Sequence, residues 1–177
     1  SPRYYVSAAY WDRDSLLWSF PAILDADSER AKEMLSYVFG RQRRNFGIHS
    51  RYIDGTVLEP GFELDELVAP LLALERYINK TDDKSILNDS DIAQGISLIL
   101  NCLRQHEAAS CRLYDTFLQP TDDEHVYPYI TYDNVLVWKA LKDLAQLAPQ
   151  YAHLEKTADE IKDAIMTHCV QKDAEGK

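Results

Sequence analysis

The sequence has few glycines and no long apolar run, and each shortage excludes a class of protein. Only six of its 177 residues are glycine, and they form neither a phosphate-binding loop nor a G-x-S-x-G nucleophile turn. No run reaches the roughly 18 apolar residues of a membrane-spanning helix. The N-terminal "SPRYYVSAAYWDRD" carries charges where a signal peptide has an apolar stretch. We therefore expect no membrane partner.

Cysteine and basic residues are also scarce. The three cysteines, Cys102, Cys111 and Cys169, form no C-x-x-C pair, which is typical of reduced thiols in the cytoplasm. The formal net charge is -10, whereas a nucleic-acid-binding protein needs a basic face to displace counterions. The histidines show no H-E-x-x-H spacing, so we expect no zinc and no other cofactor. These features predict a cytoplasmic protein without a nucleic-acid partner.

Apolar residues make up 46% of the chain, which is enough to build the core of one domain spanning 1–177. Their 3.6-residue period predicts six helices, at about 14–24, 28–43, 64–79, 90–107, 133–147 and 150–170. The region near 111–131 is rich in aromatic and β-branched residues and is interrupted by "PTDD". That pattern predicts a small β-hairpin there.

Charge is distributed unevenly among these helices. The first, third and fifth carry few charges, while the second and sixth have a strongly polar face. This alternation predicts an all-α fold of antiparallel helical hairpins, with the odd helices inside. Each odd helix follows a segment with carboxylates and aromatic rings, "YWDRD", "GFELDEL" and "YITYDN". In stacked hairpins such segments gather at one end of the array.

Two charged stretches each allow two interpretations. The carboxylates of "EPGFELDEL", Glu59, Glu63, Asp65 and Glu66, either complement a helix N-terminus or include a general acid whose pKa is raised by its neighbours. We expect Glu66 to cap the helix or to face solvent. The arginines of "RQRRNFGIHSR" either complement the end of a helix, which we favour, or include one that reaches back into an acidic cleft.

Carboxylates beside aromatic rings suit a carbohydrate site. Charged side chains hydrogen-bond adjacent hydroxyls, and rings cover the apolar faces of sugars. Hydrolysis of a glycosidic bond then needs one protonated carboxylic acid and one carboxylate that activates water or attacks the sugar. The candidates at the odd-helix entries are Trp11, Asp12, Arg13, Asp14, Glu63, Asp65, Tyr132 and Asp133. Asp65 and Glu63 are the candidate acids, and the others are candidate substrate contacts.

The segments "YWDRDSLLWSFPAIL", "RQRRNFGIHSRYIDGTVLEPGFELDELVAPLLAL" and "YITYDNVLVWKAL" resemble parts of bacterial glycoside hydrolases with an (α/α)6 toroid. Those include metal-independent exo-α-mannosidases and glucoamylase-like α-glucosidases. The resemblance implies that Asp65 matches the general acid, that Arg13 and Asp14 contact the sugar, and that the reaction inverts configuration. "FELDEL" stands where mannosidases have Y-E-x-D-S-L, which weakens the choice of mannose over glucose.

The resemblance also implies that this chain supplies about half of a toroid. The general base would then lie outside it, in the second half of a longer catalytic domain. We expect a half toroid either to self-associate through its exposed inner edge or to belong to such a longer chain. Two other functions remain open: a helical scaffold that binds a protein partner without catalysis, and a carbohydrate-binding protein that does not hydrolyse its ligand.

Overall fold

The computed structural model describes residues 9–124 and 126–171, which are mostly helical. The six predicted helices are all present within this part of the chain. The first begins as a π-helical stretch, η3 (Arg13–Ser19), and continues as α1 (Phe20–Ala26), with Pro21 close to the transition between the two. The others are α2 (Ser28–Arg41), α3 (Leu64–Thr81), α4 (Ser90–His106), α5 (Thr131–Leu147) and α6 (Leu154–His168).

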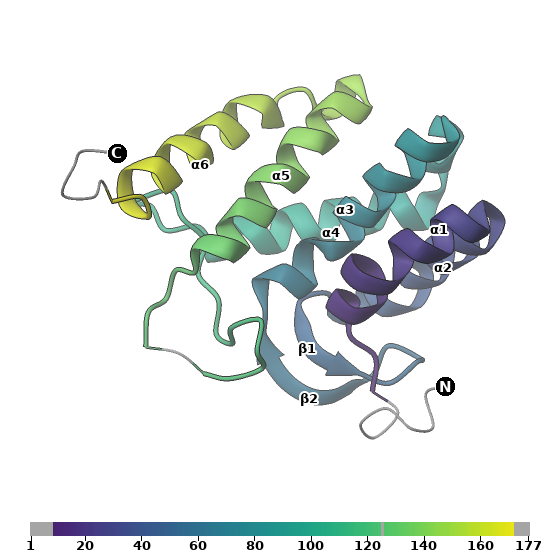
Figure 1. Cartoon of the computed structure of the whole chain (residues 1–177), viewed down its shortest axis with the longest axis horizontal. Coiled ribbons are helices and arrows are strands. Elements are labelled where there is room, and N and C mark those ends of the chain that lie inside the picture. Colours follow the sequence, from purple (N-terminus) through teal and green to yellow (C-terminus); the bar gives the residue numbers. More distant parts are fainter. Residues whose placement is uncertain (1–8, 125, 172–177) are drawn as a thin grey trace.

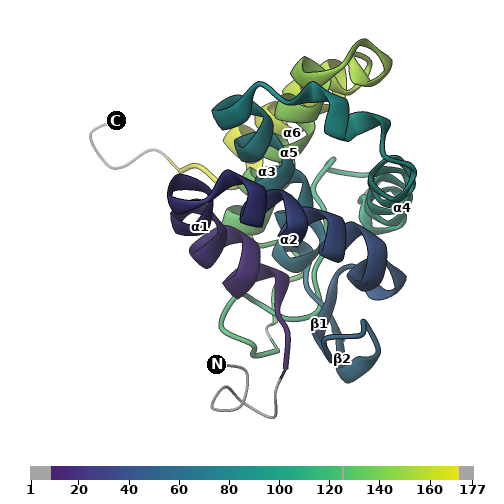
Figure 2. The same ribbon diagram turned by 90° about the vertical axis from the view of Figure 1, so that its right-hand side faces the viewer.

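The helices form two layers around α3. Helix α3 packs against α1, α2, α4 and α5, and α6 packs against α5 (Figures 1 and 2). Both the start and the middle of α3 are buried, including Leu64, Leu67 and Leu74, which are fully inaccessible. Helix α2 instead keeps one exposed polar face. The prediction of a helical-hairpin array with nearly uncharged inner helices is therefore confirmed.

The β-hairpin lies elsewhere than predicted. It consists of β1 (Ile48–Arg51) and β2 (Val57–Phe62), which pair antiparallel and lead directly into α3 (Figure 1). The turn between them contains Asp54 and Gly55, and Gly55 has a φ of +88°, a conformation that favours glycine. The Asp-Gly pair is typical of a hairpin turn. It lies between the second and third predicted helices, in a segment where the helical period predicts only a connection.

Only isolated bridges occur in the described part of 111–131, between Leu118 and Glu124 and between Tyr114 and Glu107. The amides of Phe117 and Leu118 both donate to the carbonyl of Phe62, so these groups are not available for a local ladder. The aromatic segment thus forms a loop laid against the end of β2, and the hairpin prediction for it is wrong.

Candidate active site

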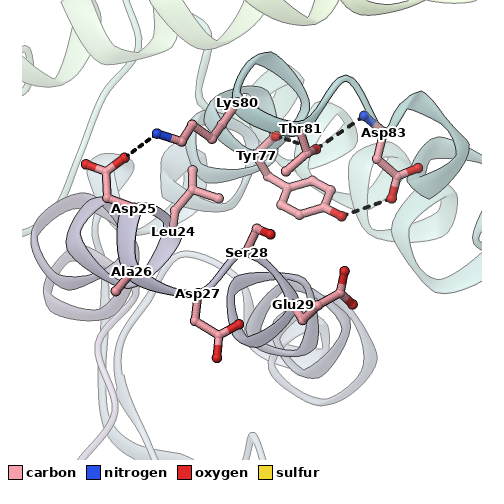
Figure 3. A pocket seen from close by; sticks show the side chains of 10 residues that line it. All are labelled: Leu24, Asp25, Ala26, Asp27, Ser28, Glu29, Tyr77, Lys80, Thr81 and Asp83. Atoms are coloured by element: carbon pink, nitrogen blue, oxygen red, sulfur yellow. Dashed lines mark hydrogen bonds and ion pairs between the residues drawn. The ribbon is translucent and has the colours of Figure 1, made fainter.

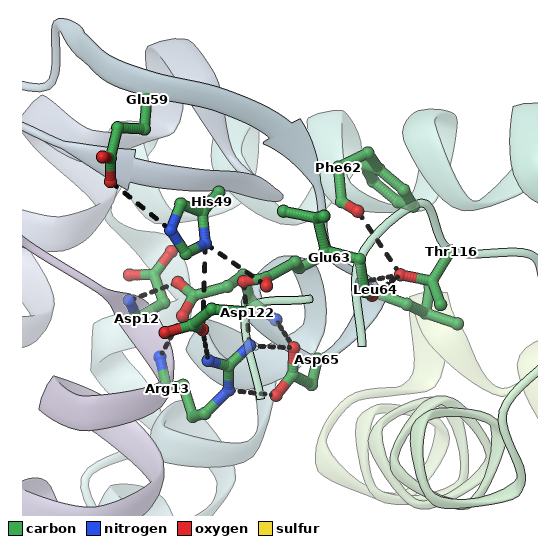
Figure 4. A network of polar contacts seen from close by, with 12 residues as sticks. Asp12, Arg13, His49, Glu59, Phe62, Glu63, Leu64, Asp65, Thr116 and Asp122 are labelled. Carbon is green, nitrogen blue, oxygen red and sulfur yellow. Dashed lines mark hydrogen bonds and ion pairs between the residues drawn. The ribbon is translucent and has the colours of Figure 1, made fainter. Parts of the chain in front are cut away.

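The starts of the inner helices meet around one guanidinium, that of Arg13 at the start of η3 (Figure 4). Its Nε lies 2.6 Å from Oδ2 of Asp65, and its Nη2 lies 3.1 Å from Oδ1 of the same carboxylate. Nη2 also donates to Glu63 at 2.8 Å, and Nη1 donates to Asp122 at 2.8 Å. Arg13, Glu63 and Asp65 are at most 2% exposed. The entry segments predicted for the first and third helices, "YWDRD" and "GFELDEL", therefore lie in direct contact.

The carboxylates around Arg13 outnumber the cations. Burial alone would lower the pKa of Arg13, but its hydrogen bond to Asp65 and the charges of Asp65 and Glu63 raise it above its ordinary value. Burial also raises the pKa of Glu63, opposed by the charges of Arg13 and His49. One guanidinium thus holds three carboxylates, two of them out of contact with water.

Asp133, at the start of α5, is a carboxyl group with a strongly perturbed environment. It is fully buried, and neither of its oxygens has a hydrogen-bond partner among the described residues. Burial raises its pKa to about 8, the charges of Asp65 and Glu63 add to this, and Arg13 opposes it. A group with this pKa carries a proton at neutral pH, which a general acid must do.

The remaining predicted residues take different positions. Tyr132 is 45% exposed, and burial, followed by the charges of Asp65 and Asp133, raises its pKa. Asp14 is half-buried on η3. Trp11 is only 7% exposed, and its ring meets the His49 ring edge-on at 6.0 Å. Asp12 is fully buried. Tyr132 is thus the predicted aromatic residue with an accessible ring.

Two members of the cluster were not identified from the sequence. His49 on β1 lies 3.3 Å from Glu63 and 3.5 Å from Glu59. Asp122 comes from the long loop before α5, and half of its side chain is exposed. It has a φ of +69°, which aspartate tolerates better than most residues. The "PTDD" pattern, which includes Asp122, predicts a turn of the chain. It does not indicate that Asp122 contacts Arg13.

His49, Glu63 and Asp122 also place one ligand atom each within 4.8 Å of one another, a spacing that a metal ion could use. However, Arg13 already donates to both carboxylates, at 2.8 Å in each case. A divalent cation would have to share this space with a fixed positive charge, which Coulomb repulsion opposes. We therefore interpret the cluster as one organised by arginine.

Glu66 and one arginine of the basic run differ from the favoured interpretations, whereas Arg41 lies in the last turn of α2 as predicted. Glu66 neither faces solvent nor caps its own helix; it is fully buried and accepts the backbone N–H groups of Asp12 and Arg13. Arg51 is also fully buried, and its Nη2 pairs with Asp12 at 2.5 Å. The alternative interpretation, an arginine reaching back into an acidic cleft, is thus the correct one for Arg51.

A separate pocket of about 500 Å³ lies where α1 ends, α2 begins and α3 ends (Figure 3). Several of its polar groups pair with one another: Tyr77 donates to Asp83 at 2.9 Å, and Lys80 donates to Asp25 at 2.9 Å. Because the Arg13 cluster lies at the starts of η3 and α3, this pocket is at the opposite end of those helices. It contains no part of the predicted site.

In the described residues, no helix combines the length and apolarity needed to cross a bilayer. No protein-family model matches the chain, and no curated protein matches it. Among solved structures, the chain is similar to a metal-independent α-mannosidase from Streptococcus pneumoniae in a non-productive complex with α-1,6-mannobiose. The two share 16% sequence identity with a TM-score of 0.75, over 96% of this chain and 53% of that one. The chain thus spans about half the length of that structure and has a similar helical fold.

Proposed function

We propose that this chain contributes to an exo-acting α-glycosidase, with an α-mannoside or α-glucoside as substrate. The observation that carries the proposal is the cluster of Glu63, Asp65, Asp122 and Asp133 around Arg13, at one end of the inner helices. The similar structure with bound α-1,6-mannobiose supports an oligosaccharide as ligand. Several carboxyl groups of unequal proton affinity beside an arginine provide what glycoside hydrolysis requires.

We propose a single-displacement reaction. The acid transfers its proton to the glycosidic oxygen as the bond to the anomeric carbon breaks, and a water molecule attacks that carbon from the opposite face. A carboxylate base takes the proton of this water, and we place that base outside the chain. Asp65 is our first candidate for the acid and Glu63 the second. The pKa of Asp133, raised to about 8, supports Asp133 as the group that stores the proton near them.

The substrate contacts divide by accessibility. We propose that Asp14 and Tyr132 touch the sugar directly, since both are partly exposed. Trp11 and Asp12, predicted as contacts, are buried among His49 and Arg51, which favours a supporting role behind Arg13. Arg13 itself is 2% exposed, and its Nη1 donates to Asp122, a loop carboxylate whose side chain is half exposed. A sugar oxygen that displaces Asp122 would meet this nitrogen.

The test of the function is turnover of aryl α-mannosides and α-glucosides by the full-length protein. We expect free sugar to be released from at least one of them, whereas no release from either would contradict the proposal. Calorimetry of the 177-residue chain with mannose and glucose addresses the alternative of binding without hydrolysis. Heat of binding without turnover by the full-length protein would favour that alternative. The absence of both binding heat and turnover would favour the helical scaffold.

We also propose that the chain self-associates through the uncovered face of its inner helices. Trp18 on η3 is 63% exposed, and Val135 on α5 is 38% exposed. Beside them runs a groove of about 260 Å³ lined by side chains of η3, α3 and α5. Burial of large apolar side chains favours association. Sedimentation velocity should show a dimer that Trp18→Glu converts to a monomer; a wild-type monomer at every concentration would contradict this.

A further inference from the structure

Glu66 and Arg51 form a second ionic cluster directly behind Arg13. The carboxylate of Glu66 accepts the N–H of Asp12 through Oε2 and the N–H of Arg13 through Oε1, the latter at 3.1 Å. These amides belong to the start of the first helix, where N–H groups have no partner within the helix. A side chain of α3 thus satisfies the beginning of another helix, more than fifty positions away in the sequence.

Arg51 connects this carboxylate to the rest of the cluster. Its Nη2 lies 2.5 Å from Asp12 and 3.6 Å from Glu66, and its Nη1 donates to the carbonyl of Asn45 at 3.1 Å. Asp12, Arg51 and Glu66 are all fully buried. Burial and the neighbouring charge of Asp12 raise the pKa of Glu66 well above its ordinary value, and the guanidinium of Arg51 opposes this shift.

One turn of α3 consequently holds Arg13 at both ends. Glu66 binds its backbone N–H, while Asp65, the preceding residue, binds its guanidinium at 2.6 Å. The amide of Glu66 also donates to Oδ1 of Asp65 at 2.9 Å, which fixes the carboxylate that receives Arg13. An arginine side chain has many rotamers, and restraining it at both ends removes most of this freedom.

We propose that Glu66 and Arg51 are positioning residues that aim the Arg13 guanidinium at Asp65 and Glu63. Any effect of this positioning on catalysis rests on the proposed function, because Arg13 contacts a substrate only if the chain contributes to a glycosidase. The positioning itself is a property of the folded chain. It can be measured without substrate, through hydrogen exchange of the Arg13 Nε–H.

The experiment compares Glu66→Gln with the wild type by NMR, with the Arg13 Nε–H signal assigned from its loss in Arg13→Lys. Glutamine keeps the shape of glutamate but accepts through one oxygen only, so one of the two backbone bonds is lost. We expect exchange of the Arg13 Nε–H to accelerate by about tenfold more than exchange of the Leu141 amide, which reports opening of the core. Glu33→Gln, at an exposed surface pair with Arg30, should change neither rate.

Equal acceleration at Arg13 and Leu141 would mean that Glu66 contributes only to global stability, and it would overturn the proposal. No acceleration would overturn it as well. If Glu66→Gln does not fold, Glu66→Asp keeps the charge but shortens the side chain by one methylene, and the same comparison applies. Absence of glycosidase activity in the wild type would refute the proposed function but leave this comparison valid.

Discussion

Replacing Asp133 by asparagine should make the protein more stable at neutral pH. The pKa of this buried carboxyl is raised to about 8, against roughly 3.9 in an unfolded chain. Between these values the folded state binds the proton and the unfolded state does not, so the stability from this group is full below pH 4 and falls as pH rises toward 8. Above pH 8 Asp133 is ionised in both states, so its contribution to the free energy of unfolding no longer changes with pH.

Asparagine has nearly the same shape as protonated aspartate and does not titrate. Three pKa units separate pH 7 from the unfolded value, and at about 1.4 kcal/mol per unit they set an upper bound of roughly 4 kcal/mol. Some of this is offset because the amide N–H groups find no better partners than the carboxyl oxygens have. We therefore expect Asp133→Asn to raise the free energy of unfolding at pH 7 by about 1–4 kcal/mol.

Urea unfolding from pH 4 to pH 9 measures this effect. The stability of Asp133→Asn relative to wild type should be lowest at pH 4, where the titration of Asp133 contributes least, grow up to pH 8 and then stay level. Asp163→Asn, at an exposed position on α6, should follow the wild type throughout. A variant less stable than wild type at pH 8, or a difference that does not depend on pH, would contradict the assigned protonation state.

Asp65→Asn should abolish most of the turnover of substrates with poor leaving groups. A general acid typically contributes a factor of about 10² to 10⁴, so kcat for an α-linked disaccharide should fall by at least about 100-fold. The variant should be far less impaired on dinitrophenyl glycosides, because a dinitrophenolate leaves without a proton. An equal loss on both substrates would indicate that Asp65 orients Arg13 and does not donate the proton.

The same comparison distinguishes the candidate acids. If Asp133 donates the proton, the difference between good and poor leaving groups should appear in Asp133→Asn and not in Asp65→Asn. If Glu63 donates it, Glu63→Gln should show the difference. Asp163→Asn again serves as the control. Each carboxyl group is buried and adjoins Arg13 or Asp65, so circular dichroism should first establish that every variant is folded.

The helices, and the proximity of Arg13 to Asp65, could be predicted from the sequence. Both follow from local patterns, since apolar residues recur with the helical period and both residues stand at the start of an inner helix. The hairpin was misplaced because the aromatic residues near 111–131 pack as a loop, with amides of Phe117 and Leu118 directed to the carbonyl of Phe62. No local pattern indicates that choice of partner.

The rest of the site depends on contacts between distant parts of the chain. Asp122 reaches Arg13 across more than a hundred residues, and His49 joins the cluster from a strand. Whether Glu66 faces water or a neighbouring helix depends on which element covers its side of α3. The pKa of Asp133 depends on burial and on the number of charges nearby. Each of these is a tertiary property that a spacing of residues cannot specify.

The most direct test of the account is the turnover of an α-linked mannoside or glucoside disaccharide by the full-length protein and by its Asp65→Asn variant. We predict that the wild type hydrolyses at least one of them and that the variant loses about 100-fold or more in kcat. Turnover by Asp65→Asn at the wild-type rate would contradict the assignment of the Arg13 cluster as an active site.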